Sequence, residues 1–281
     1  MITTRRTFCR ITAACLAGLA SYQLPLWGEE LKKYQISARH FGDNPEAAKK
    51  AGMDGIEVGV GGPSDKLRIS DPALQQRIKD QVKSSGVAVS SLSMDLLNGN
   101  PVATDARAVS WLTQTIEAAK NLNAVGILVP FFGSANLLKG KELNEKAVNE
   151  VVAKMKEVAP VAKQAKVYLG LENTCSANQN IEILNRIDCE YIACYYDIGN
   201  STNGGYDVSA EIRELKQRIC LIHFKDGANY LGEGKIKMDS VAAALHDIKY
   251  QGWIVLETSN PSKNPEADCR RNGDYIRKLM S

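Results

Sequence analysis

The chain has 281 residues, of which 44% are hydrophobic, 24% charged and 6% aromatic, a composition typical of a soluble globular protein with a sizeable core. Three of its 35 basic residues lie in the first 20 positions, where no acid occurs, so the rest of the chain carries 32 bases and 32 acids. That balance leaves no net field to hold a polyanion and argues against nucleic acid as a partner. Three histidines exclude a large histidine cluster, and seven irregularly spaced cysteines do not form a disulfide framework.

The first 28 residues predict an export signal. Thr4–Arg10 read TRRTFCR, and a weakly apolar run follows from Ile11 to Ala20. A basic start, a short apolar run and small residues are typical of a secretory signal, and the arginine pair resembles the twin-arginine motif. Ten apolar residues are too few to span about 30 Å of hydrocarbon. We expect cleavage after Ala20 or Gly28, then a mature chain exported by the twin-arginine machinery to the periplasm or beyond, without membrane insertion.

From Tyr34 onward, short apolar runs alternate with longer helical patterns. The expected strands are Tyr34–Ala38, Gly55–Val60, Val87–Met94, Val125–Phe132, Val167–Glu172, Ile192–Asp197, Ile219–Phe224 and Trp253–Glu257. The expected helices are Pro45–Ala51, Pro72–Ser84, Asp105–Asn121, Asn144–Ala165, Asn180–Arg186, Ala210–Gln217, Ser240–Lys249 and Glu266–Leu279. Strands that are apolar on both faces and separated by helices predict a buried parallel sheet.

Eight such units in about 250 residues predict a single α/β domain, a (β/α)8 TIM barrel, over residues 29–281. A doubly wound open sheet would use the same elements. That fold is disfavoured because no Gly-x-Gly-x-x-Gly turn follows a strand.

Four polar residues end the last four expected strands. Glu172, Asp197, His223 and Glu257 close the apolar runs of LGLEN, CYYDIGN, LIHFKD and IVLET. Chemistry in such a barrel collects at the carboxyl ends of the strands, where buried carboxylates without partners are costly. A divalent cation would compensate them, and three carboxylates with one imidazole suit Mn²⁺, Mg²⁺, Co²⁺ or Zn²⁺. An ordinary cap or surface acid explains one such residue better than four in succession.

These strings, together with LGEGKI and GWIVLE, resemble the sugar phosphate isomerase/epimerase superfamily, the xylose isomerase-like barrels, from about Tyr34 to the C-terminus. The resemblance implies one divalent ion, Mn²⁺ first, held by Glu172, Asp197, His223 and Glu257. It also implies that Glu172 and Glu257 act as the catalytic acid/base pair on opposite faces of a bound ketose. Removing the proton beside a carbonyl gives an enediolate, which a metal ion stabilises, and one carboxylate takes the proton while the same or the other returns it.

The predicted function is therefore a metal-dependent sugar isomerase or epimerase. An exported enzyme would act on a non-phosphorylated or keto sugar, because phosphorylated sugars are largely cytoplasmic. A lyase or dehydratase acting on a keto sugar or inosose could use the same site, since an enediolate with a β-leaving group can eliminate. A non-catalytic exported sugar-binding barrel is a third alternative, although all four ligands are present. The endonuclease IV-like barrels fit poorly, because they use a multi-zinc site rich in histidine. The sequence leaves open the sugar, the native metal and the oligomeric state.

Five further residues are weaker candidates for binding the sugar. Glu57 ends the second expected strand and resembles a substrate-binding or ligand-supporting acid, although a rim salt bridge would explain it equally well. Asn200 stands where ketose 3-epimerases of the superfamily carry a histidine, which weakens the assignment to a free ketose. Lys225 and Asp226 follow the histidine strand and would reach substrate oxygens or form a solvated loop. His40 follows the first strand and would line the mouth or be structural.

Overall fold

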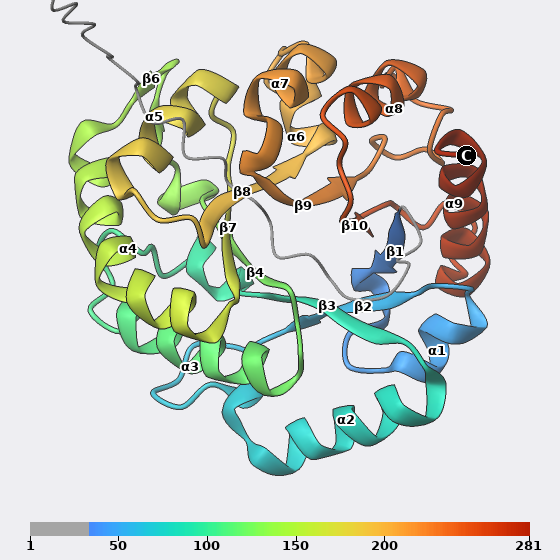
Figure 1. Cartoon of the computed structure of the whole chain (residues 1–281), viewed down its shortest axis with the longest axis horizontal. Coiled ribbons are helices and arrows are strands. Elements are labelled where there is room, and N and C mark those ends of the chain that lie inside the picture. The colour runs from blue at the N-terminus through green and yellow to red at the C-terminus, as the bar shows by residue number, and fades with distance from the viewer. Residues whose placement is uncertain (1–33) are drawn as a thin grey trace, which may run out of the picture.

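The computed structural model describes residues 34–281, and the expected export signal lies outside the described residues. Eight parallel strands close into a barrel in the order β1-β10-β9-β8-β7-β4-β3-β2. They are β1 (Gln35–Ala38), β2 (Gly55–Gly59), β3 (Ala88–Ser93), β4 (Gly126–Pro130), β7 (Tyr168–Glu172), β8 (Ile192–Asp197), β9 (Ile219–Phe224) and β10 (Trp253–Leu256). The strands form an inner ring (Figure 1), which confirms the predicted TIM barrel.

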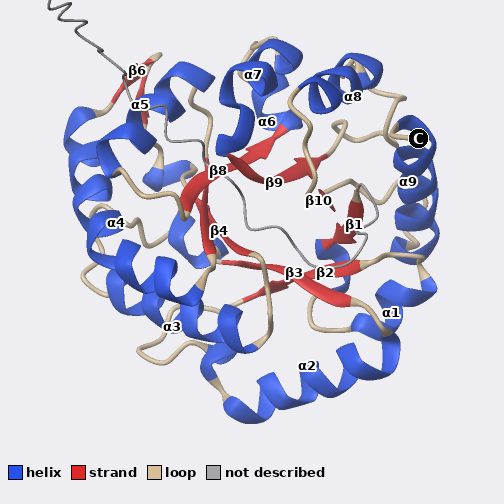
Figure 2. Ribbon diagram, in the orientation of Figure 1, coloured by secondary structure: helices blue, strands red, loops and turns tan. Residues whose placement is uncertain are grey.

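The helices form an outer ring around the strands, as Figure 2 shows by colour. They are α1 (Pro45–Lys50), α2 (Pro72–Ser85), α3 (Ala108–Asn121), α4 (Glu145–Ala165), α5 (Ala177–Ile187), α6 (Ile198–Asn203), α7 (Val208–Leu215), α8 (Met238–Asp247) and α9 (Pro265–Leu279). Local chemistry sets their ends: Asp71 caps α2 by accepting the Ala73 N–H at 2.9 Å, and Gly86 closes the helix with a left-handed φ of +76°. No helix in the described part combines the length and apolar character needed to cross a bilayer.

Several elements differ from their expected bounds: α5, α7 and α8, for example, begin two or three residues earlier than expected. Three other differences involve α3, α4 and α6. Helix α3 begins three residues late, because the Asp105 carboxylate accepts the Arg107 N–H at 2.8 Å and holds a turn there. A small hairpin, β5 (Leu138–Lys139) and β6 (Glu142–Leu143), precedes α4. Helix α6 follows β8 with no loop between them. The last of these features places a helix N-terminus directly at the carboxyl end of a barrel strand.

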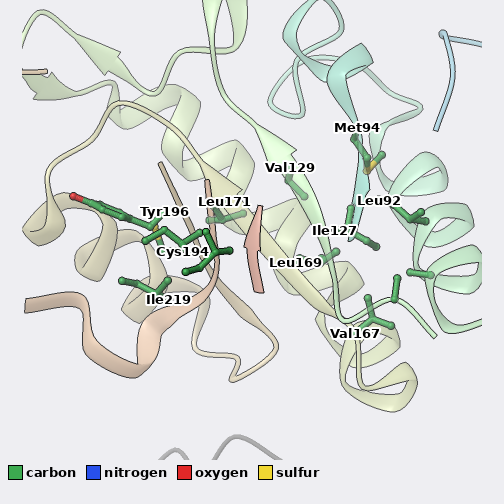
Figure 3. Close-up of a cluster of buried hydrophobic side chains, with 14 of the residues drawn as sticks. Leu92, Met94, Ile127, Val129, Val167, Leu169, Leu171, Cys194, Tyr196 and Ile219 are labelled. Carbon is green, nitrogen blue, oxygen red and sulfur yellow. The ribbon is translucent and has the colours of Figure 1, made fainter. Parts of the chain in front are cut away.

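The alternation of side chains along the strands divides the core into two layers. Ile127, Val129, Leu169 and Leu171 face the helices, and Figure 3 shows them within this outer layer. The intervening side chains fill the barrel interior. The interior cluster comprises Leu128, Tyr168, Ala193, Tyr195, Cys220, Leu221, Trp253 and Val255. Residues that continue the inward alternation toward the carboxyl ends must therefore meet above this cluster.

Glycines on some strands leave room for large side chains on neighbouring strands. A Cβ built on Gly55 would lie 2.6 Å from the Trp253 ring, and one on Gly170 would lie 2.8 Å from the Cβ of Tyr195. Both distances are shorter than real carbon contacts allow. These large side chains therefore fill the described barrel interior, and the carboxyl ends of the strands are where a site in such a barrel is expected.

Candidate metal and sugar site

Strand alternation brings the four predicted ligands together above the interior cluster. Asp197, His223 and Glu257 each lie two residues beyond an inward-facing side chain of the same chain segment. One ligand atom from each of Glu172, Asp197, His223 and Glu257 lies within 4.8 Å of the others. The first three are buried, whereas the Glu257 side chain is 22% exposed. The group, here called the four-ligand cluster, therefore opens to solvent on its Glu257 side.

His223 lies at the centre of the cluster. Its Nδ1 atom is 3.1 Å from Glu172 Oε1, 3.4 Å from Glu257 Oε2 and 3.7 Å from Asp197 Oδ2. Its Nε2 atom faces away from the cluster, 3.4 Å from Glu57 Oε1. Burial alone would lower the pKa of His223, but the phenol and carboxyl groups around it raise that pKa well above its usual value. The ring thus presents Nδ1 to the three carboxylates.

Glu57 lies behind the histidine and not in the mouth. Its Oε2 atom accepts hydrogen bonds from the Tyr195 hydroxyl at 2.7 Å and the Ser91 hydroxyl at 2.8 Å, and the residue is only 1% exposed. Burial would raise its pKa, but His223 and Arg39 lower it. This position favours support of the histidine ring over contact with a sugar.

Glu172 lies on the side of the cluster that has no described lysine or arginine, although His223 Nδ1 is 3.1 Å from its Oε1 atom. Burial, reinforced by the other carboxylates, raises the pKa of Glu172 to about 8 in spite of the nearby His223. Asn200 donates its side-chain N–H to Glu172 Oε1 across 3.4 Å, and its backbone N–H to Asp197 Oδ1 at 2.7 Å. Within the described chain no lysine or arginine forms an ion pair with Glu172. Asn200 thus lies against two predicted ligands at the start of α6.

Glu257 lies on the side of the cluster where two cations balance its negative charge, here called the compensated side. The Arg39 guanidinium donates a hydrogen bond to Glu257 Oε1, and Lys225 Nζ lies 2.7 Å from Glu257 Oε2. Burial would raise the pKa of Glu257, but His223, Lys225 and Arg39 lower it far below its usual range. Lys225 Nζ also lies 2.8 Å from Asp197 Oδ2. The predicted sugar ligand Lys225 therefore contacts two members of the four-ligand cluster.

The remaining two sequence candidates are held by the protein's own groups. The Asp226 carboxylate is 2% exposed and accepts the backbone N–H groups of Gly232, Gly234 and Ile236 at 2.9–3.2 Å. Asp226 therefore fastens the loop that follows β9 rather than presenting its oxygens to the mouth. His40 Nε2 lies 2.7 Å from the Thr258 carbonyl oxygen, which ties the end of β1 to the segment after β10. Binding of the sugar by His40 stays a prediction.

Sequence reasoning missed Arg39. It follows β1 in the short 3-10 helix Arg39–Phe41, and its Nη2 atom also donates to Asp95 Oδ2 at 2.8 Å. Its Nε atom lies 3.7 Å from Glu57 Oε1. The position of Arg39 in the sequence could have indicated its role, because a residue directly after the first strand must lie at the same barrel rim as the four predicted ligands.

The donor set fits a divalent cation. Three carboxylates and one imidazole nitrogen converge. Two buried oxygens around them make ion pairs without a hydrogen bond: Asp197 Oδ2 lies 2.8 Å from Lys225 Nζ, and Glu57 Oε1 lies 3.4 Å from His223 Nε2. Burial first, and then the neighbouring carboxylates, raise the pKa of Glu172, so a cation bound beside it would stabilise its ionised form. Oxygen and imidazole donors suit Mn²⁺, Mg²⁺ or Zn²⁺. Glu172, Asp197, His223 and Glu257 would hold such an ion.

Comparison with known proteins identifies the family of the barrel. Residues 45–279 match the family described as "Xylose isomerase-like TIM barrel". The chain belongs to this family. Among its curated relatives is the L-ribulose-5-phosphate 3-epimerase UlaE of Escherichia coli (strain SMS-3-5 / SECEC), 23% identical over 255 residues, which span 84% of this chain and 88% of the relative.

Solved structures of xylose isomerase-like barrels share the fold. A structure of L-ribulose 3-epimerase superposes with a TM-score of 0.72 at 20% identity and covers 88% of this chain and 94% of its own. The 3-keto-D-glucoside 4-epimerase YcjR from E. coli superposes with a TM-score of 0.70 at 16% identity and covers 88% and 100%. The barrel is therefore one that several sugar epimerases use.

Proposed function

We propose that this xylose isomerase-like barrel is a divalent-metal-dependent sugar epimerase or isomerase, acting by proton transfer beside a carbonyl. The observation that carries the proposal is the pairing of two carboxyl groups, Glu172 and Glu257, in one cluster with pKa values driven in opposite directions. Proton transfer between two faces of a carbon needs one group that accepts and one that delivers. The named relatives are sugar epimerases, which supports the same reaction class.

The two carboxyl groups take complementary roles in the proposed reaction. Ionised Glu257 takes the proton from the carbon beside the carbonyl, and the C–H electron pair moves to give an enediolate. Glu172, whose metal-free proton the ion would displace, takes a new proton from solvent on its second carboxyl oxygen and delivers it to the opposite face of that carbon, and the carbonyl reforms. A divalent ion held by the four-ligand cluster would polarise the carbonyl and stabilise the developing negative charge. Glu257 then loses its proton to solvent at the mouth, where its side chain is 22% exposed. Return of the proton by Glu257 to the former carbonyl carbon would move the carbonyl to its neighbour and give an isomerase.

The proposed substrate is a non-phosphorylated or keto sugar, and Mn²⁺ is the first choice of ion. Arg39 and Lys225, the described cations that contact the cluster, each already pair with two or more carboxylates. A phosphate near the cluster would therefore compete with these carboxylates. The relatives include epimerases of free and keto sugars as well as of a phosphorylated one.

Export through the twin-arginine route is part of the proposal and rests on the TRRTFCR string alone. Replacing Arg5 and Arg6 together by lysine should retain the protein in the cytoplasm. Cell fractionation of a tagged full chain measures this, and an unchanged periplasmic fraction would contradict the route.

The metal content of the purified mature protein tests the proposed function first. We expect about one ion per chain, lost in a Glu172→Gln/Glu257→Gln double variant. A Glu117→Gln/Glu214→Gln double variant changes two exposed glutamates on outer helices and should keep the ion. No ion in the wild-type protein, even after incubation with Mn²⁺, would overturn the proposal.

Solvent exchange then tests the chemistry. Incubation with free and keto sugars in D₂O should place deuterium on the carbon beside the carbonyl and yield an epimer or isomer. A dehydrated product would assign the site to the lyase alternative. Metal binding without any exchange would favour a sugar-binding barrel.

A further inference from the structure

Lys225 occupies an unusual place for a surface-type side chain. Its Nζ atom lies 2.8 Å from Asp197 Oδ2 and 2.7 Å from Glu257 Oε2, and the side chain is only 22% exposed. Both oxygens belong to residues of the four-ligand cluster. The ammonium group therefore bridges two of the carboxylates that would hold the metal ion.

The backbone is shaped to accept this lysine. Gly199, in the first turn of α6, faces the lysine stem: a Cβ at this position would lie 2.4 Å from Lys225 Cγ and 2.8 Å from its Cε atom. Contacts that short force a shift of the chain or of the lysine. Because Asp197 is the N-cap of α6 and accepts the Asn200 N–H, the first turn of this helix lies against both Asp197 and the stem of Lys225.

The charge balance of Asp197 requires such a partner. Its side chain is fully buried, and its Oδ1 atom accepts the Asn200 N–H. Its Oδ2 atom has no hydrogen-bond partner and lies 2.8 Å from Lys225 Nζ. A buried carboxylate without a neighbouring cation is strongly disfavoured. A metal ion and the lysine ammonium thus compete for one oxygen.

We propose that Lys225 is a positioning residue that serves as the internal counter-cation of the four-ligand cluster. In the metal-free protein it holds Asp197 and Glu257 together, and an incoming ion displaces it from Asp197 Oδ2. Its ammonium group, on the exposed side of the cluster, is then free to donate to a sugar oxygen. The inference rests on the proposed function only in taking the cluster as a metal site.

Two variants test the counter-cation role, with Mn²⁺ alone as the probe. Lys225→Met removes the ammonium, and Gly199→Ala displaces it without changing a ligand. Lys235→Met, which alters an exposed lysine nearby, is the control. Calorimetric titration should show Mn²⁺ binding about tenfold more tightly to both test variants, because the ion no longer breaks an ion pair of that order. The melting temperature of metal-free Lys225→Met should fall, since two carboxylates lose their shared cation.

A loss or absence of change in Mn²⁺ affinity in Lys225→Met would overturn the proposal, because a lysine that only packs would not weaken binding of the ion. Should Lys225→Met fail to fold, Gly199→Ala decides by the same criterion. The outcome is separable from that of the proposed function. Tighter Mn²⁺ binding in a protein that exchanges no sugar proton would support the role of Lys225 and contradict the enzyme assignment. Unchanged Mn²⁺ affinity in Lys225→Met, together with proton exchange by the wild-type enzyme, would contradict the role of Lys225 and support the enzyme assignment.

Discussion

The two sides of the barrel mouth carry the same residue type in opposite electrostatic states. On one side, Glu172 ends β7 among carboxylates with the neutral amide of Asn200 beside it, and its pKa is raised to about 8. On the other side, Glu257 follows β10 between Arg39 and Lys225, and its pKa is lowered. Neighbouring strands supply the difference, because β1 and β9 each bring a cation to the Glu257 side. The pKa values of two glutamates at equivalent places on the barrel rim are thus shifted in opposite directions by residues that lie far away in the sequence.

The largest test of this contrast compares two single variants. Glu172→Gln and Glu257→Gln should each weaken Mn²⁺ binding at least a hundredfold, because each removes a charged ligand. Their effects on the metal-free protein should differ. Glu257→Gln leaves two half-buried cations short of a partner and should lower the free energy of unfolding by about 1–3 kcal/mol. Glu172→Gln replaces a carboxyl group that is already neutral near pH 7 and should leave the free energy of unfolding unchanged or raise it.

Titration calorimetry and urea denaturation in the presence of a chelator measure both quantities. An equal decrease in the free energy of unfolding of the two metal-free variants would contradict the view that Glu172 and Glu257 carry different charges in the folded protein.

The pH dependence of metal binding is the next largest effect. An ion must displace the proton that Glu172 holds in the metal-free protein, whose pKa is about 8. Mn²⁺ affinity should therefore rise as pH rises from 6 to 8, by up to about tenfold per pH unit from the Glu172 proton, whose contribution levels off above that range. Loss of the His223 proton, whose pKa is also raised, adds to this slope. Titrations at a series of pH values in buffers that differ in ionisation enthalpy measure the slope and the proton released. A flat profile over this range would show that Glu172 is already ionised.

The same raised pKa bears on folding stability. The native metal-free protein binds more protons at Glu172 than the unfolded chain does between the usual pKa of 4.5 and about 8. The contribution of this group to stability is complete below the lower value and is lost as pH rises through the upper one. Metal-free wild-type protein should lose more stability than Glu172→Gln over this range, as denaturation curves at each pH will show.

Removing Arg39 should have a smaller effect, confined to the compensated side. Arg39→Met takes one of two cations from Glu257, so the pKa of Glu257 rises and the acidic limb of the pH–activity profile moves to higher pH. We expect a loss of about tenfold in kcat/KM, in the range of a misplaced general base. Arg68→Met, which removes an arginine paired with Asp43 outside the cluster, is the matched control. If the acidic limb of the pH–activity profile does not move in Arg39→Met, Arg39 does not lower the pKa of Glu257.

The smallest effect is expected from Asn200→Ala. The amide donates to Glu172 across 3.4 Å, a weak hydrogen bond, so its loss should raise the pKa of Glu172 only slightly. The pH at which Mn²⁺ affinity levels off should move up by a few tenths of a unit, with the backbone cap on Asp197 intact. A shift downward would mean that Asn200 does not stabilise the ionised form of Glu172.

The barrel and the convergence of its four ligands were predictable from the sequence, because strands buried on both faces read as apolar runs and a polar residue at the end of each run stands out. The network behind His223 was not. Tyr195 and Ser91 lie inside strands, where their hydroxyl groups look like ordinary core or small residues, and only strand order brings them to Glu57. Arg39 was missed for a related reason: a basic residue after a strand normally points into solvent.

Helix α6 and the orientation of Asp226 depend on local hydrogen bonds that the pattern of hydrophobic and polar residues does not reveal. Six residues that directly continue a strand carry no helical periodicity long enough to detect, yet the Asp197 cap starts a helix there. Asp226 follows His223 closely in the sequence, but its carboxylate turns to three backbone N–H groups of its own loop. Buried backbone N–H groups need hydrogen-bond acceptors, so the Asp226 carboxylate binds these three groups and does not face the barrel mouth. The spacing of residues in the sequence does not reveal which N–H groups need an acceptor.

The side chains of Trp253, Tyr195 and Leu221 fill the barrel interior beneath the four-ligand cluster. An ion held by that cluster would lie directly above this packed layer, and a sugar bound at the mouth would cover the ion. Under the proposed function the ion would then have to bind before the sugar, and a bound sugar would slow its release. A chelator should accordingly inactivate the idle protein faster than the protein saturated with its sugar.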